Sequence, residues 1–139
     1  MSRSRTGDEV LDALLATARH VRMDADEQLR AHGLSLARFK VIHLLEKDTL
    51  RMREVSDALG VVPRTLTSTV DGLEAEGLVE RQEDPEDRRA TRLRLTASGL
   101  RRLKEARGLL ETVHHARTAR LSAAERAQLL GLLARLRED

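Results

Sequence analysis

The hydrophobic pattern is most regular between residues 52 and 96, where it predicts two short helices followed by a β-hairpin. Leu66, Val70 and Leu73 recur at the spacing of one face of an α-helix, so we expect them to be buried. This helix is predicted to span residues 63–76. It starts with a proline, whose fixed φ and missing N–H are harmless at the first helical position.

The hairpin is predicted over residues 78–96, directly after this helix. Residues 92–96 alternate in polarity with period two, which indicates a strand, and Asp84 with Pro85 interrupts the apolar pattern at the turn. A helix, a turn, a second helix and a hairpin make a winged helix-turn-helix, which can place its second helix in the major groove of DNA. We expect this module to occupy residues 35–96, with its hairpin as the wing.

Amphipathic helices are predicted on both sides of the module, within residues 8–33 and 97–138. Thr6 and Glu9 have the spacing of a capping box, so we expect Thr6 to cap the first of these helices and Gly33 to end it. A winged helix closes its own core with three helices and a hairpin. The flanking segments therefore carry apolar faces that the module does not need.

The last helix is rich in leucine, which makes up five of the eight residues from 129 to 136. One narrow stripe on a helix cannot hold that many. Covering these side chains against a second copy of the chain would produce a two-fold homodimer, and this is the interpretation that we favour. Packing of the terminal helices on the module of the same chain is the alternative.

Several short motifs are spread over the central region: Leu59-Gly60-Val61, Thr65 to Thr67, Leu73-Glu74, Gly77-Leu78-Val79, Asp84 to Arg89 and Leu95-Thr96-x-x-Gly99. Together they resemble the MarR family of bacterial transcriptional regulators, and the resemblance covers nearly the whole chain. It implies a single domain over residues 1–139, mainly α-helical with a small β-hairpin wing, and with dimerisation helices at both ends. The implied function is sequence-specific binding of double-stranded DNA, by a dimeric repressor on a pseudo-palindromic operator.

The composition excludes several kinds of site and of protein, and it limits how the chain could bind DNA. The chain has 139 residues and no cysteine, so disulfides and thiolate metal ligands are excluded. No apolar run approaches the roughly 18 residues of a membrane span, and the N-terminal segment lacks the apolar part of a secretory signal, so we expect a cytoplasmic protein. The formal net charge is only +2, so DNA binding requires basic groups that are concentrated locally.

Four residues of the predicted recognition helix are candidates for DNA contact. Helical geometry places Arg64 and Ser68 opposite the buried stripe, with Thr65 and Thr67 on the flanks. Arg64 can donate to O6 and N7 of guanine, while the hydroxyls can contact phosphates or base edges. Many members of the family carry Arg or Lys near positions 68 and 72, where this chain has Ser68 and Gly72, so base readout is expected to depend on Arg64 and the threonines. The alternative is an ordinary solvated face.

The predicted wing carries Asp87, Arg88 and Arg89 near its tip. A protruding guanidinium can enter the narrow, negative minor groove of DNA. The resemblance assigns this role to Arg89, with Asp87 expected to hold one of the arginines by a charge-assisted hydrogen bond. Residues 80–94 contain five acidic and five basic side chains, so the wing is charge-balanced and must act through the placement of these arginines. A surface ion-pair cluster is the alternative.

The resemblance also implies a small-molecule effector, bound between the DNA-binding and dimerisation parts. Candidates to line such a site come from the first, second and fifth helices: Val21, Leu36, Phe39, His43 and Leu110. Phe39 is the only Phe, Tyr or Trp residue of the chain, which argues against a pocket built from stacked aromatic rings.

Two other functions are compatible with the same pattern. Five scattered histidines could serve a zinc- or other metal-responsive regulator, but no ligand motif joins them, so we predict no metal and no cofactor. A winged helix can also act as a protein-interaction module without specific DNA readout. An enzyme is not expected, because the sequence lacks a Gly-rich phosphate loop, a Ser/His/Asp arrangement and a His-Glu-x-x-His motif.

Overall fold

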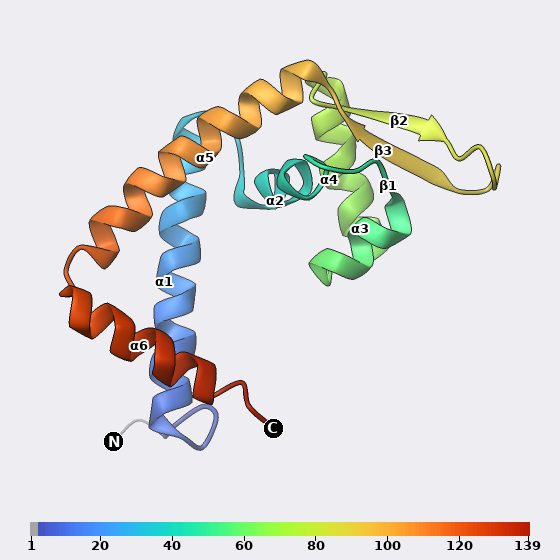
Figure 1. Ribbon diagram of the computed structural model, residues 1–139. Helices are drawn as coiled ribbons and strands as arrows, with labels where there is room; N and C mark the ends of the chain where they lie inside the picture. Colours follow the sequence, from blue (N-terminus) through green and yellow to red (C-terminus); the bar gives the residue numbers. More distant parts are fainter. Residues whose placement is uncertain (1–2) are drawn as a thin grey trace.

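The computed structural model describes residues 3–139. Along the chain it contains α1 (Glu9–Ala31), α2 (Leu36–Leu44), β1 (Leu50–Arg51), α3 (Met52–Leu59), α4 (Pro63–Ala75), β2 (Val79–Glu83), β3 (Thr91–Leu95), α5 (Ala97–Thr118) and α6 (Ala123–Arg135). The strands, α3 and α4 lie at one end of the molecule, α6 and the start of α1 at the other, and α5 runs between them (Figure 1). Among the described residues, no helix is both long and apolar enough to cross a membrane.

The predicted winged helix-turn-helix is confirmed. α4 begins at Pro63, and its stripe of Leu66, Val70 and Leu73 is fully buried. Gly77 follows with a φ of 73°, a left-handed conformation that glycine adopts without a steric penalty. β2 and β3 form the antiparallel wing, and β1 pairs with the other edge of β3, so the sheet order is β1-β3-β2.

The start of α1 differs from the expectation. Asp8 is the N-cap, because its carboxylate accepts the backbone N–H groups of Val10 at 2.8 Å and Leu11 at 3.2 Å. Thr6 instead accepts the N–H of Asp8 at 3.2 Å. A cap must directly precede the first helical residue, and Thr6 is two positions too early, so the predicted capping box of Thr6 with Glu9 is wrong.

The five helices from α1 through α5 share a single hydrophobic core with the sheet. Fully buried side chains come from almost every element, and the largest of them are Leu29, Ile42, Leu66, Leu73, Leu93 and Leu103. The winged module therefore shares its core with α1 and α5, which fixes its position relative to the long helices.

Close packing around Gly99 explains why the Leu95-Thr96-x-x-Gly99 motif ends in a glycine. It lies in the first turn of α5, where a Cβ would stand only 2.1 Å from the carbonyl oxygen of Leu78 and 2.6 Å from Cδ1 of Leu95. We expect Gly99→Ala to lower the free energy of unfolding by about 1–3 kcal/mol, because the backbone of the wing must move to admit the methyl group. Urea denaturation measures this change.

Gly108→Ala is the matched control in the same helix. Nothing lies within 4 Å of the Cβ position at Gly108, so this substitution should stabilise the protein by up to about 1 kcal/mol through helix propensity. Equal effects of the two substitutions would contradict the close contact at Gly99.

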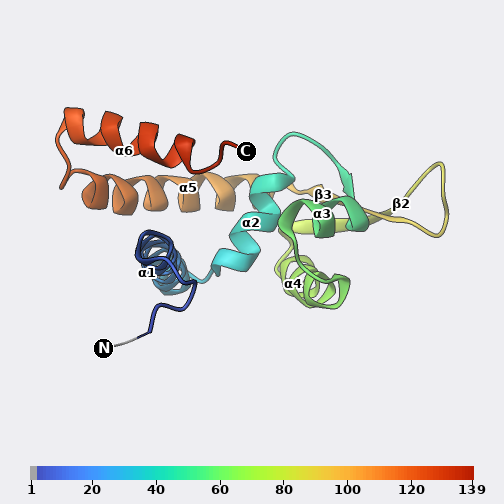
Figure 2. The ribbon, with the colours of Figure 1, turned by 90° about the horizontal axis from the view of Figure 1, so that it is seen from below.

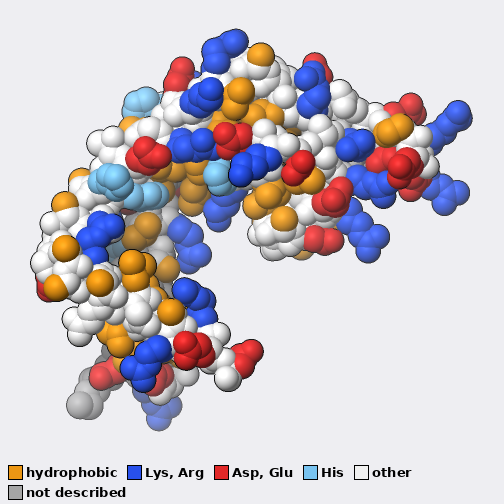
Figure 3. Space-filling model, viewed as in Figure 1, with side chains coloured by type: hydrophobic (Ala, Val, Ile, Leu, Met, Phe, Trp, Pro, Cys, Tyr) orange, Lys and Arg blue, Asp and Glu red, His pale blue; other side chains and the backbone are white. Residues whose placement is uncertain are grey.

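Apolar side chains remain exposed on the terminal helices, where Figure 3 shows orange patches over α6. None of the residues of α6 is buried. The large exposed hydrophobic side chains of these segments are Val10, Leu11, Leu15 and Met23 on α1, Leu129, Leu130 and Leu132 on α6, and Leu136 at the C-cap of α6.

Candidate nucleic-acid interface

α4 presents a polar face to solvent, opposite its buried stripe. The four predicted contact residues, Arg64, Thr65, Thr67 and Ser68, are all exposed on it. The hydroxyl of Thr67 donates to the carbonyl of Pro63 at 2.9 Å, so its oxygen is left to accept a hydrogen bond from a base. Arg64 enters no ion pair with any residue from 3 to 139.

Arg81 of β2 connects the wing to α4. Its guanidinium donates to Asp71 Oδ1 at 2.6 Å and to Glu74 Oε1 at 2.9 Å, and its backbone N–H donates to Glu74 Oε2 at 3.3 Å. The Asp71 side chain is 64% exposed, and helical geometry puts it on the same side of α4 as Arg64 and Ser68. Arg81 therefore holds the wing against α4 and neutralises two carboxylates beside the candidate DNA surface.

Arg38 of α2 lies against α4 at Gly72. Its Nη2 is only 2.2 Å from the position of a Cβ on residue 72, so a larger residue there would displace the guanidinium. Its Nη1 donates to Glu76 Oε1 at 3.0 Å. α4 itself lacks the basic side chain that the resemblance suggests at position 72, and a guanidinium from α2 occupies this flank instead.

Asp84 orders the loop at the tip of the wing. This side chain is almost fully buried, and its Oδ1 accepts the backbone N–H groups of Glu86 at 2.8 Å and Asp87 at 3.2 Å. Its Oδ2 accepts from Arg51 Nε of β1 at 2.6 Å. The hydrogen bond from Glu86 lowers the pKa of the Asp84 carboxyl, burial opposes this, and Arg51 adds to the lowering. The carboxylate thus stays charged and ties the tip to β1.

The wing projects away from the body of the molecule (Figures 1 and 2), and basic side chains extend from its end (Figure 3). Arg88 and Arg89 are exposed, and neither forms an ion pair within the described part of the chain. The expectation that Asp87 holds a guanidinium is wrong. Its Oδ1 accepts the backbone N–H of Arg89 at 3.0 Å, the bond of an Asx turn, so it shapes the loop and leaves the guanidinium free.

The sequence does not indicate the four supporting residues, Arg38, Arg51, Arg81 and Asp84. Asp84 was interpreted only as a turn residue, and nothing in the local sequence links it to Arg51, which is 33 positions away. One feature of the sequence could have indicated the position of Arg81. The predicted strand follows the helix after a very short turn, so the chain must reverse and β2 must run back along α4.

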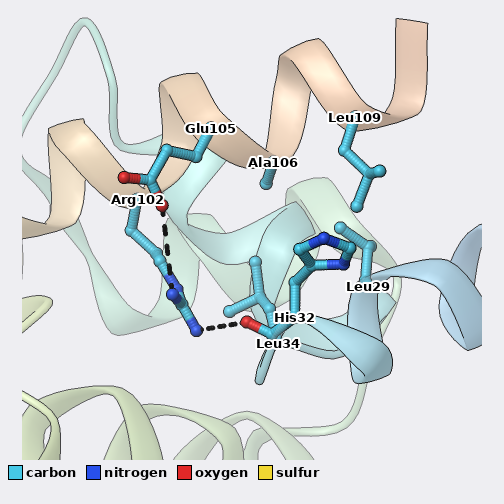
Figure 4. Close-up of a pocket in the computed structure, with 7 residues that line it drawn as sticks. All are labelled: Leu29, His32, Leu34, Arg102, Glu105, Ala106 and Leu109. Carbon is cyan, nitrogen blue, oxygen red and sulfur yellow. Dashed lines mark hydrogen bonds and ion pairs between the residues drawn. The ribbon is translucent and has the colours of Figure 1, made fainter. Parts of the chain in front are cut away.

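A small cavity lies between the end of α1 and α5 (Figure 4). Its volume is about 90 Å³, and it is lined by Leu29, His32, Leu34, Arg102, Glu105, Ala106 and Leu109. Arg102 bridges the two helices here, because its Nη2 donates to the carbonyl of His32 at 2.6 Å. None of the five residues predicted for an effector site belongs to this lining.

The predicted effector residues occupy other positions. Phe39 and His43 stack, with ring centroids 5.6 Å apart, whereas Leu110 is buried and Val21 and Leu36 are half-buried. Between residues 3 and 139, no group of three or more His, Cys, Asp or Glu side chains could hold a metal ion. The structure therefore stacks Phe39 on His43 and packs Leu36 and Phe39 against the core that contains Leu110, and it forms no cluster of metal ligands in this part of the chain.

Comparison with known proteins decides the family. Residues 32–90 match the model of the MarR family. The chain is 31% identical over 108 residues to a Bacillus subtilis (strain 168) protein named uncharacterized HTH-type transcriptional regulator YdgJ. The chain belongs to the MarR family. The matched part is 77% of this chain and 66% of the relative, so the chain spans just under two thirds of the length of YdgJ.

Solved structures of MarR proteins share this architecture. Wild-type MarR from E. coli in its apo form matches with a TM-score of 0.83 at 26% identity, over 91% of this chain and 94% of that one. A mutant E. coli MarR complexed with operator DNA matches with a TM-score of 0.80 at 26% identity, over 94% and 95%. CouR from Rhodococcus jostii RHA1, bound to p-coumaroyl-CoA, matches with a TM-score of 0.75 at 25% identity, over 91% and 90%.

Proposed function

We propose that this MarR-family chain is a sequence-specific DNA-binding regulator that acts as a dimeric repressor. The observation that carries the proposal is that α4 and the wing tip both present guanidinium groups, at Arg64 and at Arg88 with Arg89, that form no ion pair with any residue from 3 to 139. In this proposal α4 enters the major groove, where Arg64 donates to guanine, and the wing arginines enter the adjacent minor groove. The structure of the E. coli MarR mutant in complex with operator DNA supports DNA binding by a protein of this fold.

A second copy of the chain is the proposed cover for the apolar side chains of α1 and α6. α6 buries none of its residues within one chain, and contiguous exposed apolar patches on soluble proteins commonly mark interaction sites. A two-fold dimer carries two copies of α4. They would read the half-sites of a pseudo-palindrome about one helical turn apart.

An electrophoretic shift with DNA from upstream of the protein's own gene tests this function. The control is an unrelated duplex of equal length at the same salt concentration, because the phosphate contribution is independent of sequence. We expect tighter binding to the upstream DNA, on the order of 10³-fold. Equal affinity for both duplexes would contradict sequence-specific readout, and lower transcription of a reporter after deletion of the gene would contradict repression.

Arg81→Gln is expected to weaken operator binding about tenfold, or roughly 1.4 kcal/mol. Asp71 and Glu74 lose their counter-ion and then repel the DNA phosphates, while the wing loses its link to α4. Fluorescence anisotropy with labelled operator measures the change. Circular dichroism checks that the variant is folded.

A rescue experiment identifies the origin of that loss. In the Arg81→Gln background, Asp71→Asn with Glu74→Gln removes the two uncompensated charges, so most of the lost affinity should return. If the loss persists in the triple variant, the neutralising role is wrong, and the loss comes from the missing link between the wing and α4 or from a contact of Arg81 with DNA.

We further propose that a small ligand changes operator affinity, and CouR bound to p-coumaroyl-CoA supports a ligand site in this fold. A ligand acts only if it binds two arrangements of the protein with different affinities. The cavity of about 90 Å³ between α1 and α5 suits a ligand of few atoms, since a cavity of about 150 Å³ holds benzene. Leu109→Trp fills this cavity, so it should abolish a thermal shift caused by a ligand bound there. A ligand near Phe39 and His43 would still shift the variant.

A further inference from the structure

Val62 breaks a local rule at the start of α4. It is the N-cap of this helix, a position where Ser, Thr, Asp and Asn are preferred because their side-chain oxygens accept the first free N–H groups. Valine has no such oxygen, and no side chain caps the helix. Val62 takes part in the first turn only through its backbone carbonyl, which accepts the N–H groups of Thr65 at 3.0 Å and Leu66 at 3.2 Å.

Val62 is also an exposed hydrophobic residue away from the terminal helices, at the rim of a hollow that Met52, Val61 and Leu66 help to line. Its exposed fraction is 64%, and the other large hydrophobic side chains that are exposed among residues 3–139 all lie on α1, on α6 or at the C-cap of α6. The proposed dimer covers those, whereas Val62 lies at the corner between α3 and α4, next to the exposed ring of Pro63. A serine here would serve the helix better and would expose less apolar surface. Departures from local rules of this kind are typical of functional positions.

We propose that Val62 reads the 5-methyl group of a thymine in the major groove. This inference rests on the proposed DNA-binding function and names one base that the protein recognises. Recognition helices contact base edges with their N-terminal residues, and an apolar side chain distinguishes thymine through its methyl group.

The geometry of the helix start favours this role. The β-branched side chain of Val62 is restricted at χ1, and the following Pro63 ring restricts the backbone of Val62, so the two methyl groups are presented with little conformational freedom. Arg64, the candidate guanine reader, lies in the first turn of the same helix, about 200° around its axis from Val62. The thymine is therefore expected in the same half-site as the guanine but at a different base pair.

Uracil substitution tests the contact. The full-length protein is first used to select a duplex from a random library, and footprinting locates the half-sites. Each thymine is then replaced by deoxyuridine, which lacks only the 5-methyl group. In each half-site we expect one position at which uracil lowers the affinity of the wild type about three- to fivefold, the effect of one buried methyl group. At that position uracil should leave the affinity of Val62→Ala unchanged.

Two variants separate DNA contact from helix stability. Val62→Ala should keep the unfolding midpoint of the wild type, because neither side chain caps a helix. Val62→Ser supplies a cap, so its unfolding midpoint should rise by about 2–5 °C while its operator affinity falls. A serine variant that binds the operator as tightly as the wild type would overturn the inference.

The outcomes also separate this inference from the proposed function. If duplexes are selected but no uracil penalty depends on Val62, the thymine contact is wrong and DNA binding stands. If no duplex can be selected, the proposed function is wrong and the inference fails with it.

Discussion

Replacing Leu129 and Leu136 together with glutamate is expected to make the protein monomeric and to lower its operator affinity by at least about 100-fold, or roughly 2.7 kcal/mol. Both side chains are exposed in a single chain, at 44% and 52%; Leu129 lies on α6, which buries none of its residues, and Leu136 is its C-cap. In the proposed dimer each carboxylate would be moved from water into an apolar interface without a counter-ion. A monomer would then contact only one half-site.

Ala124→Glu with Gly131→Glu is the matched control for the leucine variant. It adds the same two negative charges, also seven residues apart, to exposed positions on the other side of α6, so it corrects for repulsion between the DNA and a more acidic protein. This control should remain dimeric. Sedimentation velocity measures the assembly state and anisotropy the affinity. A leucine variant that sediments as a dimer would place the interface elsewhere.

Arg89→Ala is expected to reduce operator affinity by about 1–3 kcal/mol and to make its dependence on salt shallower by about one unit of the log–log slope. Arg89 is exposed and forms no ion pair within the described part of the chain, and its backbone N–H donates to Asp87 Oδ1 at 3.0 Å. The guanidinium is therefore carried on an ordered loop, and it spends no binding energy on breaking an internal ion pair before it enters the minor groove. A salt titration of operator binding measures both quantities.

Two single substitutions provide controls for Arg89. Arg88→Ala removes the neighbouring guanidinium at the tip, so a larger effect at Arg89 would assign the groove contact to that residue. Arg120→Ala removes an exposed arginine from the turn between α5 and α6, far from the wing, and reports only the change in net charge. An affinity and a salt slope of Arg89→Ala equal to those of Arg120→Ala would contradict the role of the wing.

α4 and the wing could be predicted because their determinants are local. Pro63 at the first helical position and the left-handed Gly77 depend on the backbone of single residues, and the spacing of Leu66, Val70 and Leu73 depends on the helical repeat. The alternation that predicted β3 is equally local. The error at the start of α1 has the same origin: Thr6 and Asp8 both carry a capping oxygen, and only the position of the first helical residue chooses between them.

The supporting charges of the interface depend on packing between elements. Asp84 meets Arg51 because β1 pairs with β3, Arg81 reaches Asp71 because β2 returns along α4, and Arg38 fits beside Gly72 because α2 lies against α4. An ion pair forms only when two side chains approach within a few ångströms. Spacing along the chain says nothing about that distance once another element intervenes.

The sequence alone determined the order of the elements, the buried face of α4, the wing and the leucine-rich last helix. Each of these follows from the backbone preferences and the periodicity of neighbouring residues. Which charged side chains form ion pairs within the molecule, and which do not, was decided by the tertiary structure alone. Asp87 closes a turn, Arg81 is paired, and Arg64 and Arg89 remain free of ion pairs among the described residues. The reason is that a guanidinium is available to DNA only if folding brings no carboxylate to it.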